Sequence, residues 1–242
     1  KIKMKKLVSI IIPSYNEFSN LKELISKIND LKLENIGFEY EVIIVDDGST
    51  DNTREIISKI KNIKYIYQKN SGKGNAVQTG IKISKGEYIL IQDADLEYDP
   101  NDYYKLLEPF KTKSKISVFG SRPMKINKDT FLFKNKHTKQ NYSSYVMNKL
   151  LCIMFRFLFN VKLTDPLTGY KVYEKKFFLE NIIKSKGFEA DHEITIKLLK
   201  SKYEIFEVPI NYEPRTVKEG KKINFIDALK ALYILIKFRI IF

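Results

Sequence analysis

Three acidic residues recur at every second position directly after an apolar stretch of the chain. Asp93, Asp95 and Glu97 follow the stretch from Tyr88 to Gln92, and in extended backbone such alternate side chains project from the same face. Carboxylate oxygens grouped in this way suit Mg²⁺ or Mn²⁺, which proteins hold with few ligands of their own and which phosphate oxygens complete. The spacing therefore predicts a divalent metal site, and the alternative is an acidic turn that caps a helix.

Two other polar motifs also follow predicted strands. Asp46 and Asp47 end an apolar stretch, where carboxylates can accept hydrogen bonds from a nucleobase or a ribose. The motif Gly72-Lys73-Gly74 opens a stretch with helical spacing. Glycine lets the backbone approach a ligand closely, and a lysine at a helix N-terminus favours an anion such as a diphosphate. The motif is not a P-loop, because the spacing of a P-loop is missing.

Short apolar strands alternate with helical stretches over the first half of the chain. Between Leu21 and Leu31 the apolar residues fall at helical spacing. Near-continuous apolar strands separated by helices predict an α/β fold with a mainly parallel sheet flanked by helices. Because ligands bind beyond the carboxyl ends of such strands, the polar motifs should converge on one cleft. The predicted strands are Leu7–Ile12, Tyr40–Val45, Ile63–Tyr67, Tyr88–Gln92 and Ile116–Gly120.

The second half of the chain changes to longer helices, predicted over Tyr142–Phe159, Asp191–Lys200 and Asn224–Phe242. The last is strongly apolar but is interrupted by charged residues, so no uninterrupted run approaches the ~20 residues needed to span a bilayer. It is predicted to be an amphipathic helix that lies either on a membrane surface or on the protein core. We expect one domain over residues 1–222 and an amphipathic C-terminal helix over residues 223–242.

Charge and cysteine content restrict the class of protein. The 242 residues are 43% hydrophobic, which excludes a disordered protein, and carry a formal net charge of +14. Residues 121–242 hold 24 basic and 12 acidic groups, so the positive potential belongs to the C-terminal half. This favours nucleic acid, a phospholipid surface or a phosphorylated small molecule as partner, although biased composition alone would also give a basic surface. The single cysteine, Cys152, makes a reducing compartment the default.

Seven motifs occur in the same order as in a known family of enzymes. The chain resembles the family 2 glycosyltransferases from about residue 7 to residue 222, and within them the branch typified by dolichyl-phosphate mannose and glucose synthases. The resemblance implies a GT-A fold, a UDP- or GDP-linked sugar donor, Mg²⁺ or Mn²⁺, and inversion at the transferred sugar. The motifs are Val8–Glu17, Val45–Ser49, Gly72–Ala76, Asp93–Leu96, Gly120–Arg122, Asp165–Gly169, and Gly187–Phe188 with Asp191–Glu193.

The resemblance also implies roles for individual residues. Asp93 and Asp95 would manage the metal and the diphosphate, with Glu97 where relatives also place a metal ligand. Asp95 would also be catalytic. Pro13 and Tyr15 have the alternative of merely ending a strand. The residues implied to bind the donor nucleotide are Pro13, Tyr15, Glu17, Asp46, Asp47, Lys73 and Asp93.

The acceptor decides whether a base is needed. A hydroxyl must lose a proton, so a carboxylate or histidine must lie within reach. A lipid phosphate is already anionic and mainly needs cations. Asp191 and Glu193, on either side of His192, are candidate catalytic bases, and their alternative is an acidic helix N-terminus. The candidate cations form a basic stretch that also suits an anionic membrane surface, or a solvated loop: Arg122, Lys125, Lys128, Lys134, Lys136 and Lys139.

The basic C-terminal half and the apolar end of the chain favour a lipid phosphate acceptor. The leading hypothesis is transfer of a hexose from a nucleotide sugar to a polyprenyl phosphate by an enzyme peripheral to the cytoplasmic membrane face. By resemblance, Arg122 would act in catalysis and, with Arg215, contact phosphates of donor or acceptor; Lys136 is a further phosphate-binding candidate.

Three alternatives to this hypothesis stay open. Many relatives continue into transmembrane helices, so either the chain is truncated at Phe242 or residues 224–242 dock it. The acceptor could instead be a hydroxyl, as in diacylglycerol or a cell-surface glycan precursor. A nucleic-acid-binding protein should show aromatic stacking motifs or a helix-turn-helix, whereas the aromatic residues here fall mostly at core-like spacing.

Overall fold

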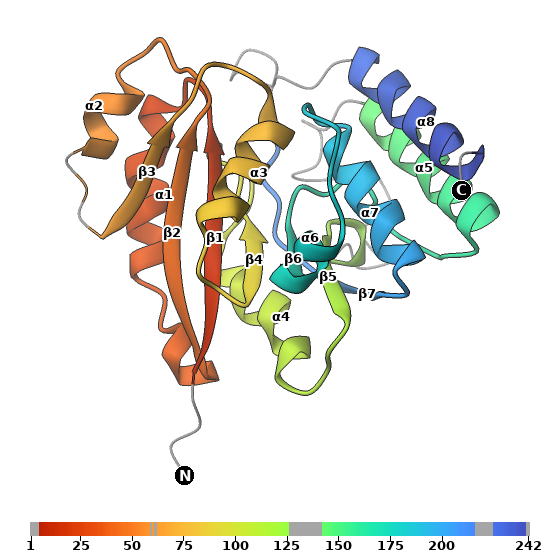
Figure 1. Ribbon diagram of the computed structural model, residues 1–242, viewed down its shortest axis with the longest axis horizontal. Helices are drawn as coiled ribbons and strands as arrows, with labels where there is room; N and C mark the ends of the chain where they lie inside the picture. Colours follow the sequence, from red (N-terminus) through yellow and green to blue (C-terminus); the bar gives the residue numbers. More distant parts are fainter. Residues whose placement is uncertain (1–4, 59, 61, 126–141, 216–224, 241–242) are drawn as a thin grey trace.

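One seven-stranded sheet forms the centre of the computed structural model, which describes residues 5–58, 60, 62–125, 142–215 and 225–240 (Figure 1). The strand order is β3-β2-β1-β4-β6-β5-β7. Among these strands β6 alone runs antiparallel to its neighbours, β4 and β5, and the other pairs are parallel. The predicted α/β fold with a mainly parallel sheet is therefore confirmed. The strands are β1 (Lys6–Ser14), β2 (Phe38–Asp46), β3 (Ile63–Tyr67), β4 (Tyr88–Ile91), β5 (Ile116–Ser121), β6 (Lys171–Glu174) and β7 (Glu204–Pro209).

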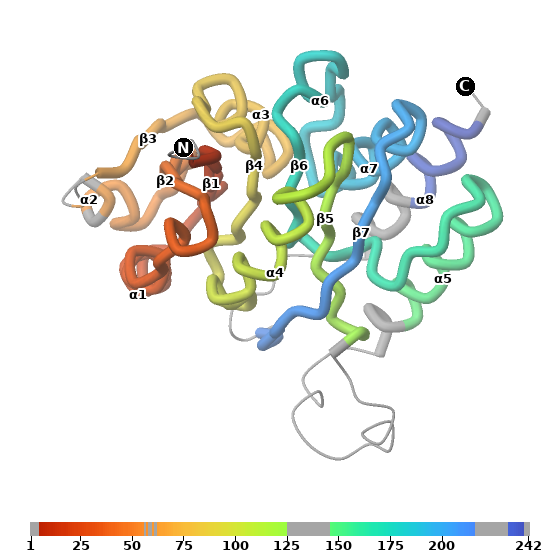
Figure 2. Tube along the Cα trace, turned by 90° about the horizontal axis from the view of Figure 1, so that it is seen from below, coloured from red at the N-terminus to blue at the C-terminus, as the bar shows by residue number. Residues whose placement is uncertain are grey.

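Helices cover both faces of the sheet, and Figure 2 shows α1 and α4 on one face and α3, α6 and α7 on the other. Alternation along β1 explains both layers, because successive side chains of a strand point to opposite faces. Ile10 and Ile12 pack into the core cluster of α1, whereas Ile11 packs into that of α3 and α7. The helices are α1 (Phe18–Asn29), α2 (Thr53–Ser58), α3 (Lys73–Ile83), α4 (Tyr103–Leu107), α5 (Tyr142–Phe159), α6 (Lys175–Glu180), α7 (Ala190–Lys200) and α8 (Phe225–Ile240), with short 3-10 turns at Leu33–Ile36, Pro100–Asp102, Glu108–Lys111 and Pro123–Lys125.

Two strands, β6 and β7, were not predicted from the sequence, and both matter for the site. β6 inserts between β4 and β5, with Lys171 opposite Ile91 at the end of β4. The chain therefore enters β6 at the edge where β4 ends. β7 runs parallel to β5 and ends at Pro209 opposite Ser121. The segments before β6 and after β7 are thus both delivered to the carboxyl-terminal edge of the parallel strands.

The C-terminal helix α8 packs against α5 and α7. Leu235 is fully buried and shares a core cluster with Leu151 of α5 and Ile196 of α7. On the same helix Tyr233 is 61% exposed and Ile236 49% exposed. The predicted amphipathic helix is thus present, and one side of it lies on the protein. None of the described helices has the length and apolar character needed to cross a membrane. A membrane contact by the outer side stays a prediction.

Candidate active site

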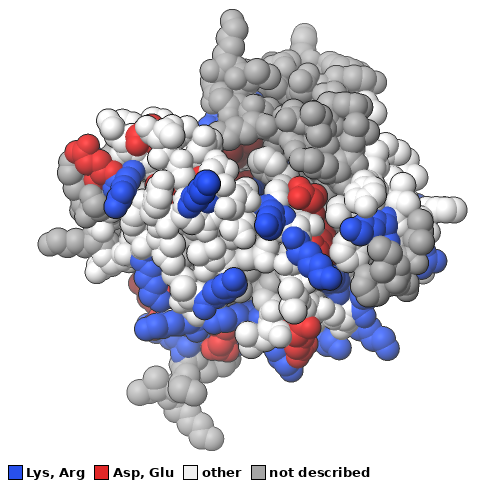
Figure 3. Space-filling model, turned by 45° about the horizontal axis from the view of Figure 1, so that its top comes forward, with Lys and Arg blue, Asp and Glu red and all other residues white. Residues whose placement is uncertain are grey.

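The polar motifs meet at the carboxyl-terminal edge of the parallel strands. In Figure 1 the arrowheads of β1 and β2 point to the top of the molecule. β4 runs parallel to β1, and β5 runs in the same direction as β4 because β6 is antiparallel to both, so the segments after β4 and β5 reach the same edge. Figure 3 turns this edge toward the viewer and shows acidic and basic side chains side by side there. The predicted convergence on one edge follows from the parallel pairing of the strands.

Arg215 connects three carboxylates of the site. Its Nη2 lies 3.1 Å from Oδ2 of Asp95, and its Nη1 lies 3.2 Å from Oε2 of Glu17. Its backbone N–H donates to Oε1 of Glu97 at 2.8 Å, and the hydroxyl of Tyr212 donates to Oε2 of the same residue at 2.7 Å. The predicted metal ligands Asp95 and Glu97 therefore share one cluster with Glu17 and with the predicted phosphate contact Arg215.

Lys73 and Asp93 form a second charged pair beside this cluster. The Nζ of Lys73 lies 2.6 Å from Oδ1 of Asp93. Burial would lower the pKa of Lys73, but the charges of Asp93 and Asp191 outweigh it and hold that pKa above its usual value. A Cβ at Gly169 would lie 2.7 Å from Oδ2 of Asp93 and 3.3 Å from Lys73 Nζ, so the glycine leaves room for the pair. The structure thus places a permanently charged ammonium at the start of α3.

Asp46 and Asp47 hold the loops that follow β2 and β3. Asp46 is fully buried and accepts hydrogen bonds from the backbone N–H of Ser49 at 2.8 Å and from the hydroxyl of Tyr65 at 2.9 Å. Asp47 accepts from the backbone N–H groups of Ser71 and Gly72 at 2.9 and 2.8 Å, and from the side chain of Gln68 at 2.6 Å. These contacts fix the loop that leads into Lys73. A contact with the nucleoside stays a prediction for both residues.

The other residues predicted to bind the nucleoside lie at the end of β1. Pro13 stands opposite Val45 of β2 and is partly buried. Tyr15 follows the strand and is 37% exposed. Glu17 is 6% exposed and accepts a hydrogen bond from the Asn20 side chain at 2.8 Å in addition to its contacts with Arg215. A contact of these three residues with the nucleoside stays a prediction.

Arg122 forms a bidentate ion pair with the buried carboxylate of Asp165. Its Nε and Nη2 lie 2.6 and 2.7 Å from the two carboxylate oxygens of Asp165, which is fully buried. The backbone N–H of Arg122 donates to the same carboxylate at 3.1 Å, and the guanidinium lies 4.8 Å from the ring centroid of Tyr212. Asp165 therefore fixes the direction of the Arg122 side chain. Whether Arg122 also contacts phosphate stays a prediction.

The two candidate bases differ in their surroundings. Glu193 is fully buried and accepts from the backbone N–H groups of Lys184 and Ser185 at 3.0 and 2.7 Å, and from Lys197 Nζ at 2.7 Å. Burial would raise the pKa of Glu193, but these bonds outweigh it and lower that pKa. Asp191 is only partly buried and its charge acts on Lys73. The contacts therefore favour Asp191 as the carboxylate that a substrate could reach.

His192 lies between these carboxylates in the sequence but is 5% exposed. Burial, followed by the charge of Lys171, lowers the pKa of His192 to about 3, so the imidazole is neutral at physiological pH. The remaining predicted cations of the basic stretch cannot be placed: Lys128, Lys134, Lys136 and Lys139 lie outside the described residues, as does the side chain of Lys125.

Sequence reasoning missed Tyr212 and the roles of Gly169 and Asp165. Tyr212 forms an antiparallel bridge with Tyr98, and the N–H of Glu213 donates to the carbonyl of Glu97 at 2.9 Å. These contacts bring the segment after β7 onto the loop after β4. No local sequence pattern predicts these contacts, because each joins residues more than a hundred positions apart. The part of the sequence that could have drawn attention to this segment is Glu207–Ile210, a mainly apolar stretch with a proline that precedes Arg215.

The carboxylate set fits a hard divalent cation with few protein ligands. Within the described residues, no group of three or more His, Cys, Asp or Glu side chains is arranged to hold a metal by itself. Asp95 and Glu97 nevertheless converge on one cation, Arg215. Carboxylate oxygens suit Mg²⁺ and Mn²⁺, and such ions complete their shell with phosphate oxygens and water. These residues therefore fit a metal that is shared with a phosphorylated ligand.

The protonation of Asp95 gives a prediction about stability. Burial and the charges of Asp93 and Glu97 raise the pKa of Asp95 from 3.8 to about 7, against the opposing effect of Arg215. The folded state therefore binds a proton that the unfolded state has lost, and stability falls as the pH rises between these two values. In EDTA, Asp95→Asn should melt above the wild type by on the order of 10 °C at pH 8, and the difference should close toward pH 4. A difference in melting temperature between Asp95→Asn and the wild type that stays constant from pH 4 to pH 8 would contradict the raised pKa of Asp95.

The sequence of the chain is similar to those of several glycosyltransferases. The model of the family described as glycosyl transferase family 2 matches residues 9–180. A dolichol-phosphate mannosyltransferase of Pyrococcus furiosus is 33% identical over 220 residues, which cover 88% of this chain and 58% of that protein. A dolichyl-phosphate beta-glucosyltransferase of Saccharomyces cerevisiae is 28% identical over 243 residues, covering 92% and 71%. The glycosyltransferase AglJ of Haloferax volcanii is 29% identical over 209 residues, covering 86% and 63%. The chain thus spans about three fifths to seven tenths of these relatives.

Solved structures share the fold. A glucosyl-3-phosphoglycerate synthase of Mycobacterium tuberculosis, solved with Mn²⁺, UDP and phosphoglyceric acid, superposes with a TM-score of 0.71 at 18% identity, covering 97% of this chain and 78% of that one. The structure with UDP alone gives a TM-score of 0.72. At this identity the likeness shows the fold, which is the GT-A fold that the resemblance implied. With the family match over most of its length, the chain belongs to the family 2 glycosyltransferases.

Proposed function

We propose that this chain is an inverting, metal-dependent transferase that moves a hexose from a UDP- or GDP-linked sugar to a polyprenyl phosphate at a membrane surface. The observation that carries the proposal is the meeting of two cations, Lys73 and Arg215, with Asp93, Asp95 and Glu97 at the carboxyl edge of the sheet. A sugar diphosphate and its metal need both signs of charge within one small site. The names of the relatives that act on dolichyl and dolichol phosphate support the choice of acceptor.

The donor side of the site would work through charge. Asp95, with Asp93 and Glu97 beside it, would hold the metal, and the metal when bound supplies a Lewis acid that stabilises the diphosphate leaving group. Lys73 is partly buried, lies at the start of α3 and stays protonated, so it would bind phosphate oxygens together with the helix N-terminus. Asp47 positions this lysine through the backbone of Ser71 and Gly72. The Mn²⁺, Mg²⁺ and UDP in solved structures of the same fold support this assignment.

The acceptor side would need cations more than a base. A phosphate is anionic before it attacks, so holding it behind the anomeric carbon is the main requirement. Arg122 has its guanidinium fixed by Asp165, and Arg215 is the second candidate. Asp191 would then orient the acceptor or Lys73 rather than remove a proton. The competing function is transfer to a hydroxyl, which needs a base. It is favoured by the partial exposure of Asp191, whose charge acts on Lys73.

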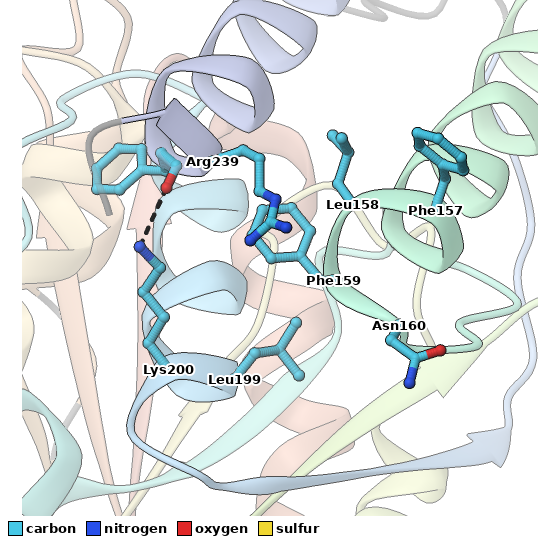
Figure 4. Close-up of a pocket in the computed structure, with 8 residues that line it drawn as sticks. Phe157, Leu158, Phe159, Asn160, Leu199, Lys200 and Arg239 are labelled. Atoms are coloured by element: carbon cyan, nitrogen blue, oxygen red, sulfur yellow. Dashed lines mark hydrogen bonds between the residues drawn. The ribbon is translucent and has the colours of Figure 1, made fainter.

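A surface on α5, α7 and α8 supports contact with a membrane. A pocket of about 450 Å³ lies between these helices (Figure 4), where the side chains of Leu199, Phe159 and Arg239 point toward one another. Phe157 on the rim is 86% exposed. Apolar side chains flanked by Lys and Arg are typical of surfaces that bind the headgroup region of anionic lipid. We propose that this surface brings the site to the acceptor, and that residues 1–222 form the catalytic domain and 223–242 the interfacial helix.

Nucleotide binding tests the donor assignment. UDP or GDP should raise the melting temperature by about 5–10 °C at a hundredfold excess over Kd in Mn²⁺ or Mg²⁺, because a ligand of the native state stabilises it. EDTA should remove most of this shift, and so should Asp95→Asn. A matched control is Glu108→Gln, which removes an exposed carboxylate outside the site and should behave as wild type. Equal shifts with metal and with EDTA would argue against a metal-dependent donor site.

The identity of the acceptor is tested by Asp191→Asn in liposomes that contain either polyprenyl phosphate or diacylglycerol. With a phosphate acceptor, kcat should fall less than about tenfold and its pH profile should keep its shape, because no base is lost. With a hydroxyl acceptor, the loss of a general base should cost about 10²–10⁴-fold in kcat. If the wild type transfers the hexose to diacylglycerol and Asp191→Asn lowers kcat by that factor, a hydroxyl acceptor would replace polyprenyl phosphate in our proposal.

A further inference from the structure

Arg215 is held differently from the other two cations of the site. Arg122 grips Asp165 through two bonds of 2.6 and 2.7 Å, and Lys73 lies 2.6 Å from Asp93. Charge-assisted bonds of N–H to carboxylate usually measure about 2.7–2.9 Å. The guanidinium contacts of Arg215 with Glu17 and Asp95 are all 3.1 Å or longer. The guanidinium of Arg215 therefore offsets the negative charge of Glu17 and Asp95 without forming short hydrogen bonds to them.

The guanidinium of Arg215 also leaves a donor unused. Its Nε is buried and has no hydrogen-bond partner among the described residues, and Oε1 of Glu97 is 3.7 Å away from it. A buried donor without an acceptor costs stability. Arg215 is thus placed among Glu17, Asp95 and Glu97 without the fork geometry that makes an arginine pair strong.

The backbone of Arg215 is fixed, although the contacts of its guanidinium are loose. Its N–H donates to Glu97 Oε1 at 2.8 Å, and the N–H of Glu213 donates to the carbonyl of Glu97 at 2.9 Å. The bridge between Tyr98 and Tyr212 holds the same segment. Rotation about the side-chain bonds of Arg215 can therefore move the charge by several ångströms while the backbone stays in place.

We propose that the guanidinium of Arg215 occupies the place of the divalent cation between Asp95 and Glu97, and that it leaves these carboxylates when a metal binds. The inference rests on the metal-dependent function proposed above. Arg215 would offset the clustered negative charge while no metal is bound. Once released, it would be free to bind a phosphate group of donor or acceptor. One residue would then compete with the metal and assist the phosphate, so metal binding would prepare the phosphate site.

This dual role predicts that loss of Arg215 strengthens the binding of metal alone and weakens the coupling between metal and nucleotide. Arg215 would compete with the metal but assist the phosphate, and the coupling between the two ligands is reciprocal. Arg215→Met removes the competing charge and keeps the length of the side chain. Binding of Mn²⁺ alone, measured by electron paramagnetic resonance at pH 8, should tighten by about tenfold. The factor by which UDP or GDP increases the affinity for Mn²⁺ should shrink by a similar factor. A purely structural arginine would weaken both.

Two further variants control the experiment. Arg215→Lys keeps the charge but can reach fewer carboxylate oxygens at once, so its affinity for Mn²⁺ alone should lie between wild type and Arg215→Met. Lys176→Met removes an exposed charge on α6 and should match wild type, which excludes a general effect of net charge. Melting curves confirm that each variant is folded.

The outcomes separate the inference from the function on which it rests. Unchanged or weaker binding of Mn²⁺ alone by Arg215→Met, while wild type binds Mn²⁺ with nucleotide, would overturn the exchange and leave the transferase proposal in place. No binding of Mn²⁺ by wild type, even with nucleotide, would overturn both. Tighter binding of Mn²⁺ alone together with weaker coupling to nucleotide would establish the exchange.

Discussion

Mutual repulsion of carboxylates is the constraint on which the site depends. Asp93, Asp95 and Glu97 follow one strand, and Glu17 joins them from the end of β1. Burial, followed by the like charges of Asp93 and Glu97, raises the pKa of Asp95 to about 7. The fold meets this constraint with two cations brought from distant parts of the chain. Lys73 pairs with Asp93 and Arg215 with Asp95, so each cation offsets part of this negative charge.

The cations also explain how the two halves of the chain form one site. Lys73 comes from α3 in the N-terminal half, and Arg215 comes from the segment after β7, almost at the end of the described chain. Each is positioned by other residues: Asp47 holds the loop before Lys73, and Tyr212 and Glu97 hold the backbone beside Arg215. The same logic applies to Arg122, which Asp165 fixes from the segment that enters β6. The position of each cation in the candidate site therefore depends on contacts made far along the sequence.

The sequence predicted the parallel strands and their polar ends well, because both are local signals. The apolar strands β1 to β5 and the motifs after them could be recognised within a few residues of each other, and their convergence followed from the direction of parallel strands. β6 escaped prediction because it is four residues long and contains the fully buried Lys171. The partners of Glu193 and Asp47 could not be foreseen either. An acidic residue beside a motif looks the same whether it meets a ligand or the backbone of a neighbouring loop.

The chain is thus a family 2 glycosyltransferase, and we propose that Arg215 of its charged site exchanges its carboxylate partners for phosphate when a metal binds. Crystals grown with Mn²⁺ and the nucleoside diphosphate that binds would test this directly, through an anomalous difference map at the manganese edge. We predict one manganese peak bonded to the carboxylate of Asp95, with the guanidinium of Arg215 withdrawn from it and Lys73 on the diphosphate. A manganese ion bound away from Asp95, or Arg215 still paired with Asp95 beside a bound ion, would contradict the account.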